Sequence, residues 1–329
     1  MSQPNPIAPK PWKDYTDLVS RLENNGMIVP DRARAERKIS QIGYYRLSGY
    51  WYPCRQIELD DTGRQVKRYG LPMRSSAFQE GTNFDDIVRL YIFDKRLRQL
   101  ILDAVERIEV NIRTIIAHVV GQQDALAYEN PSFINPKKLA TYFQNGNVRN
   151  QWHDWLGNHK AKINRSREDH IEWHKRSQKA IPFWVAVEAW DFGTMSKYFE
   201  LLKMSHQTRV AEKVGVSTVK NLVNWLREIN TLRNRCAHHA RIWNQSSSNP
   251  LNYENDPFFH GLPSNGESKK RMLGLIAVIG YLTKQIGPGS RWIEDVAALI
   301  DDKPNPPSCS LSAMGIPEDG FPRAAFGIG

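Results

Sequence analysis

Cysteine is scarce in this chain of 329 residues, which contains only three. Cys54, Cys236 and Cys309 lie far apart, and no Cys-x-x-Cys spacing suggests a zinc site or a redox pair. An odd number of cysteines suits a reducing compartment. We therefore expect a cytoplasmic protein without a cofactor or a bound metal.

Long apolar runs are also missing. The longest, "LGLIAVIGYL" at residues 273–282, is too short to span a bilayer. The N-terminal "MSQPNPIAPKPW" is polar and rich in proline, and it has no apolar core of a signal peptide. Neither secretion nor insertion into a membrane is indicated.

Basic residues, in contrast, are in excess. The chain has 45 Lys and Arg against 35 Asp and Glu, which gives a net charge of +10. Hydrophobic residues make up 40% of the sequence, enough to build real cores. A globular protein with this charge favours polyanionic partners, but the charge alone does not choose among RNA, DNA and anionic lipid.

Helical periodicity dominates the pattern and predicts a mainly α fold, a helical bundle. Asn83 is a good N-cap for a long helix that runs to about residue 120. β-type residues on either side of Asp-Thr-Gly, within residues 56–69, suggest a short β-hairpin. We divide the chain into a mostly helical subdomain (1–80), a helical domain (81–301) with a basic insertion at about 121–180, and a Pro- and Gly-rich tail (302–329).

The stretch "TLRNRCAHHARIWN", residues 231–244, places cationic side chains in an otherwise helical pattern. Arg233 falls on the apolar stripe of that helix, where a guanidinium must be paired or must open onto a cleft. Asn234 and His238 share a face, whereas His238 would point about 140° away from Arg233 along a straight helix. The arginines of this cluster could bind a phosphodiester, and its imidazoles could transfer a proton. The competing interpretation is a buried ion pair with ordinary histidines.

A second Arg and His pair lies on the other long helix, in "ERIEVNIRTIIAHVV" at residues 106–120. Arg113 and His118 are again separated by four residues. A structural interpretation is strong here, because Glu109 and Arg113 form a well-oriented i, i+4 ion pair and His118 flanks the apolar stripe.

The segment at residues 149–179 is the most basic and most aromatic stretch, and we expect it to be exposed. Aromatic side chains interleaved with cations are typical of RNA-binding surfaces. The candidate RNA-binding residues of this segment and of the 231–244 stretch are Arg149, Lys160, Lys162, Arg165, Arg167, Lys175, Arg176, Arg235 and Arg241.

Four stretches in order along the chain resemble the Abi family of bacterial abortive-infection proteins, the AbiD/AbiF-like group. They are "IGYYRLSGYWYP", "YIFDKRLRQLILDAVERIEVNIRT", "LRNRCAHHARIWN" and "MGIPEDGF". The spacing of Arg233, Asn234 and His238 also resembles the Arg-polar-x-x-x-His motif of HEPN-domain ribonucleases. This resemblance implies a HEPN-like helical bundle, commonly dimeric, in which two such motifs face one cleft and cut RNA without a metal.

The resemblance also implies a role in phage defence and control by a structured noncoding RNA. Carried over to this chain, it makes His238 the general acid or base, with His239 as the alternative imidazole. Arg233 would clamp the charge that develops on the phosphorus, and Asn234 would orient both groups. Arg113 and His118 would form the second motif. No acidic cluster has a two-metal pattern, which disfavours a metal-dependent nuclease.

Two other functions stay open at this point. One is a non-catalytic RNA-binding protein of a toxin-antitoxin-like system, in which the Arg233, Asn234 and His238 motif serves RNA binding or structural stability rather than cleavage. The other is a DNA-binding regulator that reads DNA with the basic helix at residues 31–41, although the charges of that short helix are typical of a solvated face.

Overall fold

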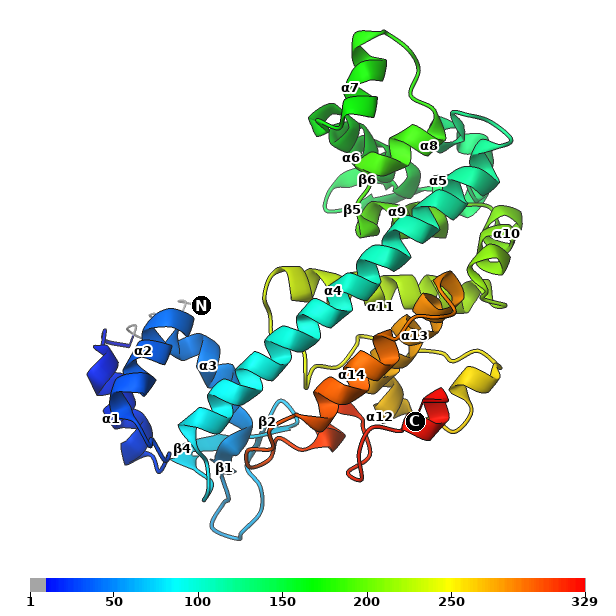
Figure 1. Cartoon of the computed structure of the whole chain (residues 1–329). Coiled ribbons are helices and arrows are strands. Elements are labelled where there is room, and N and C mark those ends of the chain that lie inside the picture. The colour runs from blue at the N-terminus through cyan, green and yellow to red at the C-terminus, as the bar shows by residue number, and fades with distance from the viewer. Residues whose placement is uncertain (1–9, 329) are drawn as a thin grey trace. The chain divides into compact units, whose positions relative to one another are not determined.

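The computed structural model describes residues 10–328, so most of the proline-rich N-terminal stretch lies outside it. It confirms a mainly α fold with small antiparallel sheets (Figure 1). The chain divides into two compact units. The N-terminal unit comprises the chain up to Lys95 together with Asp302–Leu311, and the larger unit comprises Arg96–Asp301 and the segment from Ser312.

Three helices open the N-terminal unit: α1 (Tyr15–Asn24), α2 (Arg32–Ile42) and α3 (Tyr44–Trp51). The predicted cap of α2 is confirmed, since the Asp31 carboxylate accepts a hydrogen bond from the Arg34 amide at 2.9 Å. The α2 cations serve ion pairs: Arg32 contacts Glu23 and Arg34 contacts Asp85.

The aromatic stretch at residues 42–53 packs as expected. It forms α3 and a turn of 3-10 helix, Tyr52–Cys54. Tyr50 and Trp51 are fully buried. The Tyr50 hydroxyl donates to the buried carboxylate of Asp94 at 2.7 Å, which joins two of the stretches that carry the family resemblance.

The predicted hairpin is present in a larger form. β1 (Arg55–Ile57) pairs antiparallel with β4 (Arg74–Phe78), and between them β2 (Lys67–Arg68) pairs with β3 (Leu71–Pro72). An isolated bridge joins Leu59 to Gln65 across the Asp-Thr-Gly turn. The returning C-terminal segment packs here as well, where the Sγ atoms of Cys54 and Cys309 lie 3.8 Å apart.

The long helix predicted after Asn83 is α4 (Phe84–Gly121). The Asn83 side chain accepts a hydrogen bond from the Asp85 amide at 2.8 Å, which confirms the cap. The boundary between the two units falls within α4, after Lys95. Most of its predicted apolar stripe is buried, including Leu97, Ile101, Ala104, Ile108, Ile112 and Val119.

The basic insertion of the larger unit is ordered into helices and a hairpin. It contains α5 (Pro136–Leu139), the strand pair β5 (Thr141–Gln144) and β6 (Asn147–Asn150), then α6 (Gln151–Arg165) and α7 (Asp169–Arg176). Asn145 and Gly146 make the turn of the hairpin, both with positive φ. This is the conformation that Asn-Gly favours in two-residue hairpin loops.

The apolar pattern that follows Pro182 in the sequence favours one continuous helix, and this expectation is wrong, because two helices take its place. α8 (Phe183–Ala186) and the 3-10 turn Val187–Ala189 end before Asp191, and α9 (Phe192–Leu201) begins after it. The Asp191 carboxylate accepts hydrogen bonds from the amide and hydroxyl of Thr194, at 2.8 and 2.7 Å. This capping competes with a continuous helix at Asp191.

The remaining helices are α10 (Met204–Val214), α11 (Val219–Ala237), α12 (Gly266–Lys270), α13 (Met272–Ile286) and α14 (Trp292–Asp301). Further 3-10 turns are Ala127–Glu129, Pro131–Phe133, Pro257–Phe259, Leu311–Met314 and Arg323–Phe326. Ser217, the expected cap of α11, instead donates its hydroxyl to Glu254.

Helix packing in the larger unit runs from α6 through α9 to α11, and from α11 through α13 to α14 (Figure 1). α13 is buried along nearly its whole length, which explains why its sequence is the longest apolar run. Within residues 10–328, none of the helices combines the length and apolarity needed to cross a bilayer.

Candidate functional site

The 231–244 stretch begins as helix and ends as a tight turn. α11 stops at Ala237, so His238 and His239 lie beyond the helix rather than on it. The amide of His239 donates to the carbonyl of Cys236 at 3.0 Å, and the amide of Ala240 donates to the carbonyl of Arg235 at 2.9 Å. These two bonds form a Schellman motif, with His239 at the position where glycine is usual.

The backbone of His239 is left-handed, with φ of 58°. This conformation is uncommon for residues with a Cβ, and it concentrates at functional sites. The turn is also held from α4, where the buried side chain of Arg98 donates to the Ala240 carbonyl at 3.1 Å. Along a continuous helix Ala240 would fall on the same apolar stripe as Arg233, but this expectation is wrong, since Ala240 is exposed in the turn.

Arg233 is half-buried, as its place on the apolar stripe predicts. Its Nη1 atom donates to the Asn234 side-chain oxygen at 3.3 Å. Asn234, His238 and His239 are exposed. The turn therefore presents an amide and an imidazole to solvent next to a half-buried guanidinium.

The i, i+4 ion pair predicted between Glu109 and Arg113 is wrong: within residues 10–328, Glu109 forms no ion pair, and Arg113 and Arg233 act on its carboxylate only as nearby charges. Burial raises the pKa of Glu109 above its ordinary value, while the charges of Arg113 and Arg233 oppose that rise. The Arg113 guanidinium donates to the carbonyls of Val187 at 3.3 Å and Trp190 at 2.8 Å. Arg113 thus joins α4 to the break before α9 and also acts on Glu109.

His118 lies apart from this cluster. It is exposed and lines a pocket of about 420 Å³ with Thr114, Ala117, Gln122, Trp184, Val187 and Glu188. Arg113 points instead to the main chain of Val187 and Trp190. The structure therefore brings Arg113 close to the 231–244 motif and leaves His118 in a different pocket.

The expectation of an exposed 149–179 segment holds only in part: Trp152 and Trp155 are buried, whereas Trp173 on α7 is 52% exposed. Trp152, Trp155 and His159 follow one face of α6 at spacings of three and four residues, and that face packs on α9. The Trp155 and His159 rings stack at 5.2 Å, and Trp190 donates its indole N–H to His159 Nδ1 at 2.8 Å. Burial lowers the pKa of His159 to about 4.

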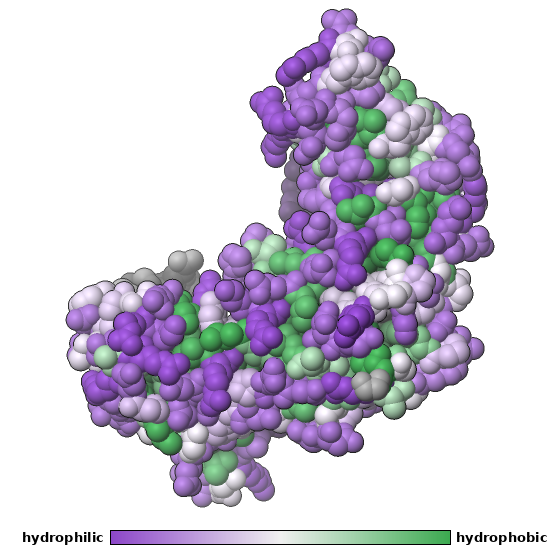
Figure 2. All heavy atoms as spheres, in the orientation of Figure 1, coloured by the Kyte–Doolittle hydropathy of each residue, from purple (hydrophilic) through white to green (hydrophobic). Residues whose placement is uncertain are grey.

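The cations of the same segment lie outside that core, and Figure 2 shows a mostly hydrophilic surface over the α6 and α7 end. Glu172 is their common partner on α7, at 3.0 Å from Lys175, 3.8 Å from Arg176 and 4.0 Å from Arg167. Hydrogen bonding from Lys175 lowers the pKa of Glu172. Lys160 and Arg165 are exposed on α6.

The other predicted RNA-binding residues have partners within the larger unit. Arg149 pairs with Asp154 at 3.2 Å, and Lys162 pairs with Asp191 at 2.7 Å. Arg235 Nη1 lies 3.5 Å from the Ser246 carbonyl oxygen, and Arg241 is half-buried.

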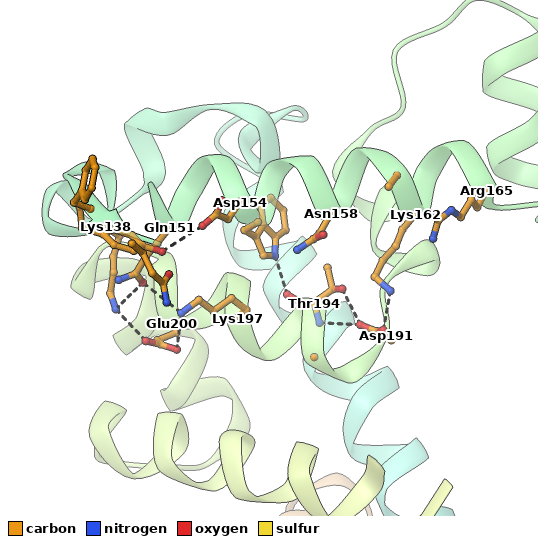
Figure 3. Close-up of a pocket in the computed structure, with 16 residues that line it drawn as sticks. Lys138, Gln151, Asp154, Asn158, Lys162, Arg165, Asp191, Thr194, Lys197 and Glu200 are labelled. Atoms are coloured by element: carbon orange, nitrogen blue, oxygen red, sulfur yellow. Dashed lines mark hydrogen bonds and ion pairs between the residues drawn. The ribbon is translucent and has the colours of Figure 1, made fainter. Parts of the chain in front are cut away.

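A pocket of about 1010 Å³ lies between α5, β5, α6 and α9 (Figure 3). Ion pairs line it: Glu200 contacts Lys138 at 2.9 Å and Lys197 at 3.3 Å. Burial would raise the pKa of Asp191, but hydrogen bonds from Lys162 and Thr194 outweigh it and hold that pKa at about 2.

Sequence reasoning missed this pocket, including Lys138, Asp191, Lys197 and Glu200. The Asn145-Gly146 pair between two β-rich runs could have indicated the hairpin at its rim. No local signal placed α6 against α9, because that contact joins segments far apart in sequence. Among the described residues, no three His, Cys, Asp or Glu side chains form a group that could hold a metal ion.

A comparison with protein families finds one match, a model for Abi-like proteins that covers residues 37–244. The matched region includes α3, α4, the pocket and the turn at His238. No curated protein and no solved structure matches the chain significantly.

Proposed function

Because the chain belongs to the Abi-like family, which associates it with abortive-infection defence against phage, we propose that it binds RNA and cuts it without a metal ion. We assign it to the AbiD/AbiF-like group, with a HEPN-type site and a cytoplasmic place of action. The observation that carries this proposal is the half-buried Arg233, which donates to the Asn234 side chain at 3.3 Å beside a turn that exposes Asn234 and His238.

Each group has a role that suits its position. Arg233 clamps the charge that develops on the phosphorus, because it is half-buried and a guanidinium keeps its charge there. His238 is free to rotate toward the ribose 2′-hydroxyl as the general acid or base, since it follows the last residue of α11. Asn234 orients the Arg233 side chain.

We propose a homodimer controlled by a structured noncoding RNA. His118 lies in a separate pocket, so one chain offers one complete Arg, Asn and His set. A second copy would supply the second imidazole at a shared cleft. The exposed cations of α6 and α7 would bind the RNA backbone.

The same position of His118 favours a second candidate function. A protein whose second histidine lies outside the Arg233 turn, and whose second arginine is bound to carbonyls as Arg113 is, could hold RNA without cutting it. This is the non-catalytic RNA-binding component of a toxin-antitoxin-like system.

The experiment that separates the two functions uses two neighbouring histidines. His238→Ala should abolish cleavage of RNA and leave RNA binding nearly intact, because a neutral imidazole adds little to the grip of a +10 protein. His239→Gly is the matched control, since glycine adopts the left-handed backbone that the turn requires and keeps His238 in place.

Cleavage should persist in EDTA and should leave a 2′,3′-cyclic phosphate, as expected when the ribose 2′-hydroxyl is the nucleophile. A substrate with a 2′-O-methyl group at the cut site should resist. The role assigned to His238 would be contradicted if His238→Ala cleaved RNA as fast as the wild type. It would also be contradicted if only His239→Gly lost cleavage activity. Tight RNA binding without cleavage by the wild type would favour the non-catalytic function.

A further inference from the structure

We propose that the pocket between β5, α6 and α9 holds one unpaired nucleobase of an RNA strand, which stacks on Phe143 at one end of α6 while Arg165 at the other end contacts a phosphate further along the strand. The inference rests on the proposed RNA-binding function and adds a binding site for a single nucleotide. Both residues line the pocket, Phe143 from the hairpin and Arg165 from the end of α6.

The charges of the pocket are suited to a base rather than to a bare phosphate. Its lining has four cations and three carboxylates, so its net charge is small. Lys138 and Lys197 are engaged by Glu200, and Lys162 is engaged by Asp191 (Figure 3). A phosphate inside would have to displace these carboxylates, whereas a neutral ring would not.

Side-chain amides supply hydrogen bonds for the edge of a base. Asn158 points from α6 into the space above α9 (Figure 3). Within residues 10–328, nothing forms a hydrogen bond with its side chain, which offers one acceptor and two donors. Unpaired bases of RNA are recognised by such contacts on their edges, combined with stacking on their faces.

Phe143 supplies the stacking surface. Its side chain is 74% exposed on the β5–β6 hairpin, which has a two-residue turn and a regular antiparallel register. The neighbouring Tyr142 is fixed by its hydroxyl, which donates to Asp154 at 3.3 Å. A rigid hairpin therefore presents an aromatic face at the rim of the pocket. Stacking of a base on such a face is strong and tolerates any base.

Arg165 is the one lining cation left for the backbone of the strand. It is exposed at the last position of α6, and no described residue pairs with it. The volume of about 1010 Å³ is at the upper end for small-molecule sites and accommodates a nucleobase with its water.

The pocket also adjoins the Arg233 cluster through Asp191. That carboxylate pairs with Lys162 in the pocket, and the carbonyl of the preceding residue, Trp190, accepts a hydrogen bond from Arg113 at 2.8 Å. A strand whose base is held in the pocket can therefore continue toward Arg233. The pocket would position the strand for cleavage and would select unpaired RNA over duplex.

The test measures binding of a single-stranded oligouridylate of about 12 nucleotides with one 2-aminopurine, within the site sizes typical of single-strand binders. All proteins carry His238→Ala so that the strand is not cut. Phe143→Ala should weaken binding about tenfold and remove the quenching of 2-aminopurine, because the stacking surface is lost. Phe143→Trp, which keeps an aromatic face at this position, should retain both the affinity and the quenching.

Arg165→Gln should lower the slope of log affinity against log salt by about 0.7, the value for one phosphate contact with a single strand. Tyr45→Ala is the matched aromatic control, since Tyr45 is also 74% exposed, and Lys213→Gln is the control for charge on an exposed helix position. Neither control should change binding or quenching.

The possible failures are distinguishable. If the His238→Ala protein binds no RNA at low salt, the proposed function and this inference both fail. If it binds RNA but Phe143→Ala leaves affinity and quenching unchanged, or if duplex RNA binds as tightly as single strands, only the pocket assignment is overturned.

Discussion

His159 makes the stability of the larger unit depend on pH between about pH 4 and pH 6.5. Its side chain is 1% exposed, stacks on Trp155 and accepts a hydrogen bond from Trp190. Burial lowers the pKa of His159 to about 4, whereas an unfolded histidine has a pKa of about 6.5. Between about pH 4 and pH 6.5, His159 therefore binds a proton in the unfolded chain but not in the folded chain.

The free energy of unfolding should therefore be highest above pH 6.5 and should fall as the pH decreases toward 4. The linkage relation gives a loss of about 2 kcal/mol at pH 5 and about 3 kcal/mol once both states are protonated. Protonation of His159 also removes the acceptor for Trp190 and opens the wall of the pocket that Trp155 lines.

Urea unfolding followed by tryptophan fluorescence measures this loss at pH 7 and pH 5. The control is His159→Gln, whose amide oxygen can still accept from Trp190 but whose side chain does not titrate. The wild type should lose about 2 kcal/mol more than the variant over this interval. Equal losses in the two proteins would refute the reasoning, because all other titrating groups are shared.

Two further predictions concern the His238 turn and the RNA surface. Arg98→Gln should reduce the rate of RNA cleavage with little change in RNA affinity, because the buried guanidinium of Arg98 holds the Ala240 carbonyl and does not bind the strand. A loss of affinity as large as the loss of cleavage rate would contradict this positioning role. Charge reversal at the exposed Lys160, Arg165 and Arg167 should weaken RNA binding and reduce its dependence on salt concentration. The helix content measured by circular dichroism should stay the same. Unchanged RNA binding would mean that other residues bind the RNA backbone.

The amino-acid sequence by itself determined the elements that depend on local chemistry. Asp31 and Asn83 have the side chains that cap helices, and the buried stripe of α4 follows from apolar residues at helical spacing. The burial of Arg233 was also predictable, because its position on the stripe of α11 depends only on the helix period.

Tertiary contacts decided where the helix of the 231–244 stretch ends. The local pattern allows a helix through Ala240, but the Schellman bonds and the contact from Arg98 on α4 form a turn after Ala237. A contact so distant in sequence does not appear in the local helical pattern, so the turn at His238 and His239 could not be predicted, although the helix period already placed His238 off the apolar stripe.

The same reason explains the rest of the candidate site. The buried face of α6 looked like an exposed aromatic surface, because Trp155 and His159 are hidden only by α9 and Trp190. The contacts of Arg113 with the Val187 and Trp190 carbonyls, and the pocket beside Asp191, depend on packing between segments far apart in sequence. Sequence periodicity supplied the side chains, whereas long-range packing set which of them face one another.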